Sequence, residues 1–173
     1  MVVERITPYI KQSAKIIDIG SGSGDVALLL QTQGYDITPV DVSDFHGPRL
    51  VKTIIYDGKK LPFPDKSFDT ALLLMVLHHT SNPELILSEA KRVAKEIVLI
   101  ETSYTSFINK IYTVITDTIA NLRLNWYWDS YKTDEKWRKF FDKKGLKVVK
   151  VHKYNDRNIG LPFLHVLYYL RPF

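Results

Sequence analysis

The sequence predicts an α/β fold, with one domain in which helices alternate with the strands of a mostly parallel sheet. A run rich in β-branched residues, Ile16 to Ile19, leads through three glycines into an apolar segment with helical periodicity. Further short apolar runs alternate with helical patterns along the chain, which is typical of a parallel sheet covered by helices on both faces. The 173 residues, 45% hydrophobic and 25% charged, suffice for one such domain with a substantial core.

Periodicity and helix-capping signals place the elements in order. A short helix over 3–13 is expected first, with Ile6, Tyr9 and Ile10 on one face. Asn82-Pro83 marks the start of a later helix, because asparagine caps helix N-termini and proline suits the first helical position. Strands are predicted at 16–20, 36–41, 51–56, 70–77, 96–101, 146–154 and 163–170, helices at 24–33, 83–95, 107–122 and 133–144, and loops at 42–50 and 155–162.

The segment from Asp18 to Asp25 joins the first strand to the first helix, where backbone N–H groups can face an anionic or nucleotide ligand. A dinucleotide fingerprint needs G-x-G-x-x-G, whose third glycine lies inside the helix. Here the glycines are Gly20, Gly22 and Gly24, and Asp25 stands where that third glycine would be. Asp18 would repel a pyrophosphate, but it can accept a hydrogen bond from an ammonium group. An ordinary glycine-rich βα turn is the alternative.

Asp41 ends the second predicted strand, 21 residues after Gly20. In nucleotide-binding α/β folds an acid at this place commonly binds the ribose hydroxyls, because a carboxylate can accept two hydrogen bonds. A surface turn would also suit an acidic residue. The position at the carboxyl end of a strand favours contact with a ligand.

Three segments together resemble a known family. They are D-x-G-x-G-x-G at 18–24, the strand ending in an acid at 36–41, and D-G-K-K-L-P-F-P-D-K-S-F-D at 57–69 with L-H-H at 77–79. These segments resemble the S-adenosylmethionine-dependent methyltransferases with a Rossmann-like fold, in the subgroup that includes ubiquinone/menaquinone-biosynthesis enzymes. The resemblance covers roughly residues 12–102, and beyond them it rests on the order of elements alone.

The resemblance implies a three-layer αβα sandwich whose mostly parallel, seven-stranded sheet has an antiparallel last strand. It implies S-adenosylmethionine as cofactor and S-adenosylhomocysteine as product. It also implies that Asp57 bonds the adenine amino group while the next backbone N–H reaches a ring nitrogen. The cofactor-binding residues expected on this basis are Asp18, Gly20, Ser21, Gly22, Gly24, Asp41, Val42, Asp57, Gly58 and Leu74.

Residues 102–131 exceed what a minimal fold of this kind requires. A helical stripe that includes Phe107, Ile111 and Ile115 is followed by four aromatic residues between Trp126 and Tyr131. Such a stripe is most often part of a core. Because the segment before the first strand is short, this insertion is also the candidate for a cap or lid that keeps water from the cofactor's methyl group and lines the acceptor pocket.

Methyl transfer requires a bound cofactor, an aligned acceptor and the exclusion of water, and it requires a base only when the acceptor arrives protonated. His78 and His79 are the candidate catalytic bases, because imidazole titrates near neutral pH. Successive residues at a strand end point to opposite sides, so at most one is expected to face the site. Glu101 and Tyr104 are comparable candidates. The other histidines do not cluster in sequence with carboxylates, and no metal site is expected.

Charge and composition bound the partners. The net charge is +5, and residues 123–173 alone carry 12 basic and 5 acidic side chains. This basic third could attract RNA or consist of solvated lysines, whereas a small lipophilic or aromatic acceptor suits the insertion and is slightly favoured. The lack of a signal-like N-terminus and of an apolar run of about 18 residues predicts a cytoplasmic protein without a membrane span.

Two alternatives to a methyltransferase stay open at this point. One is a nicotinamide-dependent oxidoreductase, which the glycine spacing disfavours. The other is a non-catalytic relative that keeps the fold and the cofactor but acts through a partner.

Overall fold

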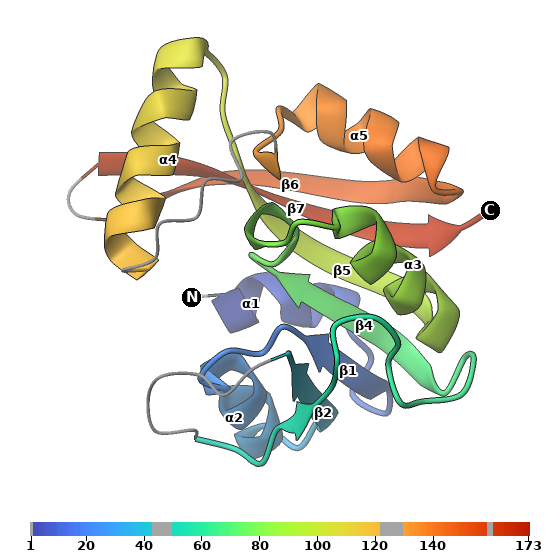
Figure 1. Ribbon diagram of the computed structural model, residues 1–173. Coiled ribbons are helices and arrows are strands. Elements are labelled where there is room, and N and C mark those ends of the chain that lie inside the picture. The colour runs from blue at the N-terminus through green and yellow to red at the C-terminus, as the bar shows by residue number, and fades with distance from the viewer. Residues whose placement is uncertain (1, 43–49, 122–129, 159–160) are drawn as a thin grey trace.

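The computed structural model describes residues 2–42, 50–121, 130–158 and 161–173, which form one seven-stranded sheet with helices on both faces (Figure 1). The strand order is β3-β2-β1-β4-β5-β7-β6. Among these residues, β7 alone runs antiparallel to its neighbours β5 and β6. The three-layer fold with a mostly parallel sheet and an antiparallel last strand is therefore confirmed.

Five of the strands and the helices before and between them come from the first 103 residues. In chain order they are α1 (Val2–Ile6), the 3-10 helix η1 (Thr7–Tyr9), β1 (Lys15–Ile19), α2 (Asp25–Thr32), β2 (Asp36–Asp41), β3 (Ile54–Ile55), β4 (Phe68–Leu74), the 3-10 helix η2 (Leu77–His79), α3 (Pro83–Val93) and β5 (Ala94–Ser103). The remaining elements are α4 (Phe107–Asn121), α5 (Asp134–Lys143), β6 (Leu146–Asn158) and β7 (Leu161–Pro172).

Some boundaries differ from the sequence prediction. The first helix gives way to a 3-10 turn that carries Pro8 and ends at Tyr9 instead of continuing to 13, because proline cannot donate the backbone hydrogen bond of a helix interior. The third strand is only two residues long, against the six predicted over 51–56. The fourth strand ends at Leu74, because Met75 adopts the left-handed conformation (φ 63°) and turns the chain out of the sheet.

The prediction of a loop at 155–162 is also wrong for most of these residues. Strands β6 and β7 continue as a paired ladder through this region, with Asn155 opposite Leu164 and Asn158 opposite Leu161. The predicted loop at 42–50 lies outside the described residues, except for Val42 and Leu50.

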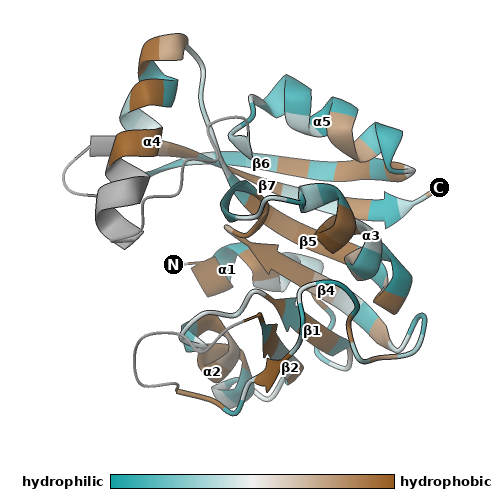
Figure 2. Cartoon of the chain, in the orientation of Figure 1, coloured by the Kyte–Doolittle hydropathy of each residue, from teal (hydrophilic) through white to brown (hydrophobic). Residues whose placement is uncertain are grey.

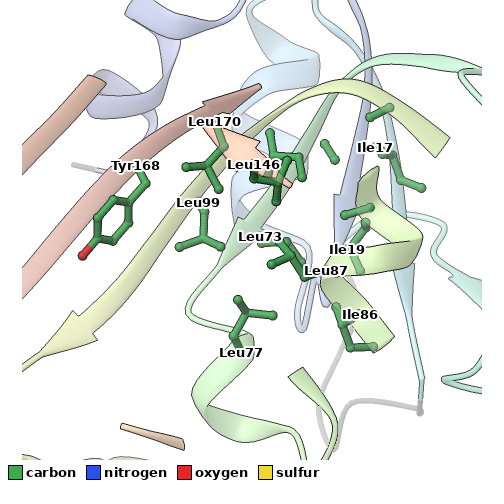
Figure 3. Packing of buried hydrophobic residues seen from close by; sticks show 14 of the residues in the cluster. Ile17, Ile19, Leu73, Leu77, Ile86, Leu87, Leu99, Leu146, Tyr168 and Leu170 are labelled. Atoms are coloured by element: carbon green, nitrogen blue, oxygen red, sulfur yellow. The ribbon is translucent and has the colours of Figure 1, made fainter. Parts of the chain in front are cut away.

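The strands bury side chains on both faces because successive residues point to opposite sides. Ile17, Leu73 and Leu99 lie in the cluster on the face that α3 and α5 cover, part of which Figure 3 shows. Their neighbours Ile16, Leu72 and Val98 belong to the second cluster, with residues of α1 and α2. This alternation explains why the central strands read as nearly continuous apolar runs.

The predicted cap at Asn82 is confirmed, since its Oδ1 accepts a hydrogen bond from the backbone N–H of Leu85 at 3.1 Å. Thr133 caps α5 in the same way, and its Oγ1 accepts from the N–H of Lys136 at 3.3 Å. None of the described helices is both long and apolar enough to cross a membrane.

Helix α4 stands beyond the carboxyl ends of β4 and β5, beside the hairpin end of β6 and β7 (Figure 1). The rings of Tyr112 and Phe163 are 5.7 Å apart and connect α4 to β7. Apolar and polar residues alternate along the first turns of α4 (Figure 2). The apolar residues Phe107 and Ile108 at its start are 68% and 77% exposed, while Lys110 and Thr113 are buried. The described part of the stripe is therefore not part of the core.

Candidate functional site

The glycine loop between β1 and α2 has the conformation that only glycine adopts at low cost. Gly20, Gly22 and Gly24 have φ values of 78°, 55° and 84°. A Cβ on Gly20 would lie 2.7 Å from Cγ2 of Val76, and one on Gly24 would lie 2.4 Å from Cγ2 of Val51. A Cβ on Gly22 would have no atom within 4 Å. Close packing thus surrounds two glycines, and open space faces the third.

The loop is anchored to the end of β2. The backbone N–H groups of Gly20 and Ser21 donate to the carbonyl of Val40 at 2.9 and 3.1 Å. Among the described atoms, the buried Oγ of Ser21 has no hydrogen-bond partner. A buried hydroxyl without a partner beside open space suits a polar ligand.

Asp41 lies at the end of β2, as predicted, and its carboxylate faces the glycine loop. Oδ2 accepts from the N–H of Gly22 and Oδ1 from the N–H of Val42, each at 2.7 Å. A carboxylate has about four acceptor positions, so this one can also accept hydrogen bonds from ligand hydroxyls. Sequence reasoning found Asp41 but not its bond to the glycine loop, because that bond depends on the packing of β1 against β2.

Asp18, near the end of β1, is 2% exposed. Its removal from water, and secondly the negative charge of Asp41, raise the pKa of Asp18 to about 7. A cation bound beside this buried carboxylate would stabilise its ionised form. The ammonium partner expected from the sequence fits this environment.

Asp57 and Gly58 follow β3 in a turn beside the same strand ends. Asp57 Oδ1 accepts from the N–H groups of Lys59 (2.8 Å) and Lys60 (3.1 Å), and these bonds hold the pKa of Asp57 below its usual value. A Cβ on Gly58 would lie 3.2 Å from Cγ1 of Val42. The turn therefore lies against the end of β2, where the sequence places the adenine contact.

A charged network on α3 fixes the chain that follows this turn. Arg92 donates from Nη2 to the carbonyl of Leu61 (3.0 Å) and from Nη1 to the carbonyl of Phe63 (2.7 Å) and Oδ1 of Asp65 (3.0 Å). Glu89 accepts from two guanidinium nitrogens of Arg92 and from the N–H of Leu61 at 2.7 Å. The sequence analysis missed this pair, whose only signal is the i, i+3 spacing of opposite charges on a helix.

The site thus has a glycine loop with open space, a carboxylate at each of three strand ends or turns, and a buried hydroxyl. A family profile described as a methyltransferase domain matches residues 2–151. The chain belongs to this methyltransferase family. The family is part of the class I methyltransferases, those with a Rossmann-like fold, which use S-adenosylmethionine as cofactor. This agrees with the resemblance found in the sequence. The match argues against the nicotinamide-dependent oxidoreductase.

Individual proteins similar to this methyltransferase support the assignment. The uncharacterized protein MJ1123 of Methanocaldococcus jannaschii is 35% identical over 100 residues, which are 56% of this chain and 48% of that protein. A demethylmenaquinone methyltransferase of Thermotoga maritima is 30% identical in an alignment of 118 positions that covers 60% of this chain and 52% of that protein. The chain therefore spans about half the length of these curated relatives.

A solved structure shares the fold over almost the whole chain. The S-adenosylmethionine-dependent methyltransferase of Methanosarcina mazei superimposes with a TM-score of 0.73, covering 98% of this chain and 97% of that one at 17% identity. At that identity the similarity concerns the fold alone.

The candidate bases of the methyltransferase lie on the turn that leaves β4. His78 and His79 form part of η2, and their ring centroids are 4.0 Å apart. The expectation that they point to opposite sides is wrong, because they follow a 3-10 turn and not an extended strand. His78 is 1% exposed, whereas His79 is half-buried, so the two rings differ in their access to a ligand.

The other predicted candidates have separate places. Glu101, at the end of β5, is fully buried and contacts His78. Tyr104 lies beyond β5, with Nζ of Lys110 5.5 Å from its ring centroid. Leu74 ends β4 opposite Ile100 of β5. The described residues contain no group of three or more potential metal ligands, while His46, Trp126 and Trp128 lie outside the described residues.

Proposed function

We propose that this protein transfers the methyl group of S-adenosylmethionine to a small lipophilic acceptor. The observation that carries the proposal is the open space at Gly22, bordered by the carboxylate of Asp41. A ligand that lies along this loop meets the two-oxygen acceptor of Asp41, as ribose recognition requires.

Residues of this chain would bind three parts of the cofactor. Asp41 would accept the ribose hydroxyls, and the turn at Asp57 and Gly58 would take the adenine. Asp18 would pair with the ammonium group, which stabilises the charged carboxylate. The bound cofactor supplies a methyl group already activated by a positively charged sulfur, so the protein's part is to orient the acceptor and exclude water.

Helix α4 is the proposed cap over the acceptor, within the insertion at 102–131. The helix lies beyond the carboxyl ends of β4 and β5, where open α/β sheets bind their ligands (Figure 1). Its exposed apolar residues, Phe107, Ile108, Ile111 and Ile115, offer a surface for a lipophilic molecule. The name of the Thermotoga maritima relative, a demethylmenaquinone methyltransferase, points to the same class of acceptor.

His78 and His79 are the proposed proton acceptors for an acceptor group that arrives protonated. Both rings lie on the turn that follows β4, next to the glycine loop through the contact of Val76 with Gly20. A neutral imidazole can take a proton at neutral pH, and the half-buried ring of His79 is more accessible to an acceptor than the buried ring of His78.

RNA is the less favoured acceptor. Three of the twelve basic residues in the C-terminal third, Lys147, Lys150 and Lys153, are exposed on β6, the outermost strand of the sheet. Lysines on an edge strand keep it from pairing with other chains, so these charges have a structural reason.

Calorimetric titration with S-adenosylhomocysteine tests the cofactor assignment. Asp41→Asn should weaken binding at least about tenfold, since each charge-assisted hydrogen bond contributes roughly 1.5–3 kcal/mol. Asp36→Asn, an exposed acid at the other end of β2, is the matched control and should bind normally. Equal affinity in wild type and Asp41→Asn would refute the role of Asp41.

Transfer of a labelled methyl group tests the acceptor class. The protein is incubated with labelled S-adenosylmethionine and, in separate reactions, with reduced naphthoquinones carrying short isoprenoid tails and with bulk tRNA. Label in the quinone fraction alone is the expected result. Label in tRNA would contradict the proposed acceptor, and cofactor binding without transfer to any of these acceptors would favour the non-catalytic relative.

A further inference from the structure

The carboxylate of Glu101 makes three contacts with the turn that leaves β4. Oε1 accepts from the N–H of Leu77 at 2.7 Å and from that of Val76 at 3.1 Å. Oε2 pairs with Nδ1 of His78, and both side chains are 0% exposed. One buried side chain of β5 therefore holds the backbone of the histidine turn and one of its imidazole rings.

This turn needs such an anchor. Met75, just before the turn, has a φ of 63°, which residues other than glycine adopt only under strain. Its N–H donates to the carbonyl of Ile100 at 2.8 Å. Val76 then packs so closely on Gly20 that no Cβ would fit between them. The position of the turn is thus coupled to the loop that faces the cofactor.

The hydrogen-bond pattern also fixes the ring of His78. Carboxylate oxygens accept hydrogen bonds and do not donate them, so Oε2 acts as an acceptor toward Nδ1. The proton of a neutral His78 therefore sits on Nδ1, and Nε2 carries the lone pair. The rings of His79 at 4.0 Å and Tyr131 at 5.0 Å pack around His78 and shield it from water.

We propose that Glu101 is a positioning residue of this methyltransferase. It holds the turn between β4 and α3 and fixes the tautomer of the buried His78, whose ring packs on that of His79 and so positions the half-buried imidazole that can take a proton from the acceptor. In that step the O–H or N–H bonding pair stays on the acceptor atom, and the proton moves to the imidazole of His79. This role in catalysis rests on the proposed function, and it replaces the expectation that Glu101 is itself a base, since its oxygens already accept three hydrogen bonds.

Glu101→Gln separates these roles. The glutamine Oε1 can still accept from Val76 and Leu77, but its amide group would donate to Nδ1 of His78 and move the ring proton to Nε2. Nitrogen-15 NMR of the imidazoles should report the Nδ1–H form of His78 in the wild type and the Nε2–H form in the variant. Once an acceptor is identified, kcat should fall roughly 100-fold, with S-adenosylhomocysteine affinity unchanged.

The matched control is Glu96→Gln, at the other end of β5, where the carboxylate accepts from Tyr169 and Arg171 instead. It should leave the His78 tautomer and kcat as in the wild type. The proposal is overturned if His78 carries its proton on Nε2 in the wild type, a result that needs no variant to fold. It is also overturned if Glu101→Gln retains the wild-type kcat.

The two proposals fail in different measurements. A folded wild-type protein that does not bind S-adenosylhomocysteine refutes the proposed function, whatever the tautomer of His78. A protein that binds it but whose His78 tautomer does not depend on Glu101 refutes the positioning role alone.

Discussion

Asp18 should give the free energy of unfolding an unusual dependence on pH. Burial raises the pKa of Asp18 to about 7 from its ordinary value of 3.8, so the folded protein keeps a proton there that the unfolded chain has released. The contribution of Asp18 to the free energy of unfolding is complete at pH values below its pKa in the unfolded chain. It is lost as the pH rises toward its pKa in the folded protein. The loss is about 4 kcal/mol in all, and about 2–3 kcal/mol of it falls between pH 5 and 8.

Asp18→Asn removes this titration while keeping the shape of the side chain. The difference in the free energy of unfolding between variant and wild type, from urea denaturation at several pH values, should shift by about 2–3 kcal/mol in favour of the variant from pH 5 to 8. Comparing the two proteins cancels the carboxylates that titrate the other way, such as Asp69, whose pKa is lowered by its bond to Lys95.

The same group should couple cofactor binding to pH. An ammonium group pairs with ionised Asp18, so binding at pH 5.5 must displace a proton. With a pKa of about 7, the ionised fraction falls roughly 25-fold from pH 7.5 to 5.5, and the affinity for S-adenosylhomocysteine should fall by the same factor. Calorimetry in buffers of different ionisation enthalpy should detect the proton released at pH 5.5.

A wild-type affinity that is constant from pH 5.5 to 7.5, with no proton released, would refute this account of Asp18. So would an Asp18→Asn variant whose affinity follows pH as steeply as that of the wild type. The variant should instead show a weaker affinity that hardly changes with pH.

Three further predictions concern the glycine loop, the Arg92–Glu89 pair and helix α4. Gly22→Ala and Gly34→Ala each place a side chain at positive φ (55° and 82°) and should each cost about 1 kcal/mol of unfolding free energy, but only Gly22→Ala should abolish cofactor binding in calorimetry. Arg92→Met should lower the thermal midpoint and weaken cofactor binding several-fold, because it frees the chain after the adenine turn and leaves Glu89 without its partner. Lys139→Met, which removes the exposed pair with Glu135, should change neither. Amides of α4 should exchange hydrogen fast in the free protein and more slowly with ligand bound, and strong protection in both states would place α4 in the permanent core.

The sequence sufficed for the parts of the fold that local chemistry determines. The glycine spacing, the apolar runs and the cap at Asn82 predict the central sheet and its helices, because each signal acts within a few residues. The sequence predicted an end of β4 three residues too late, at Leu77, because Leu77 is as apolar as the strand before it. Only tertiary packing forces Met75 into the left-handed conformation that ends the strand.

The candidate site divides in the same way. The places of Asp18 and Asp41 at the ends of β1 and β2 could be predicted, because the apolar strand patterns before them define those ends. The contacts of Glu101 with Val76 and His78 span 23 to 25 residues and those of Arg92 with Leu61 and Phe63 about 30, so no local pattern reveals them. The exposure of the stripe on α4 was equally hidden, since periodicity shows that a face is apolar but not what covers it.

The central claim is that the loop from Gly20 to Gly24 binds S-adenosylmethionine, and one calorimetric experiment tests it directly. The wild-type protein at pH 7.5 is titrated separately with S-adenosylhomocysteine and with NAD, and Gly34→Ala serves as the folded control for Gly22→Ala. The account predicts binding of S-adenosylhomocysteine at one site, no binding of NAD, and loss of binding in Gly22→Ala alone. Tight binding of NAD without binding of S-adenosylhomocysteine by the folded wild type would contradict it.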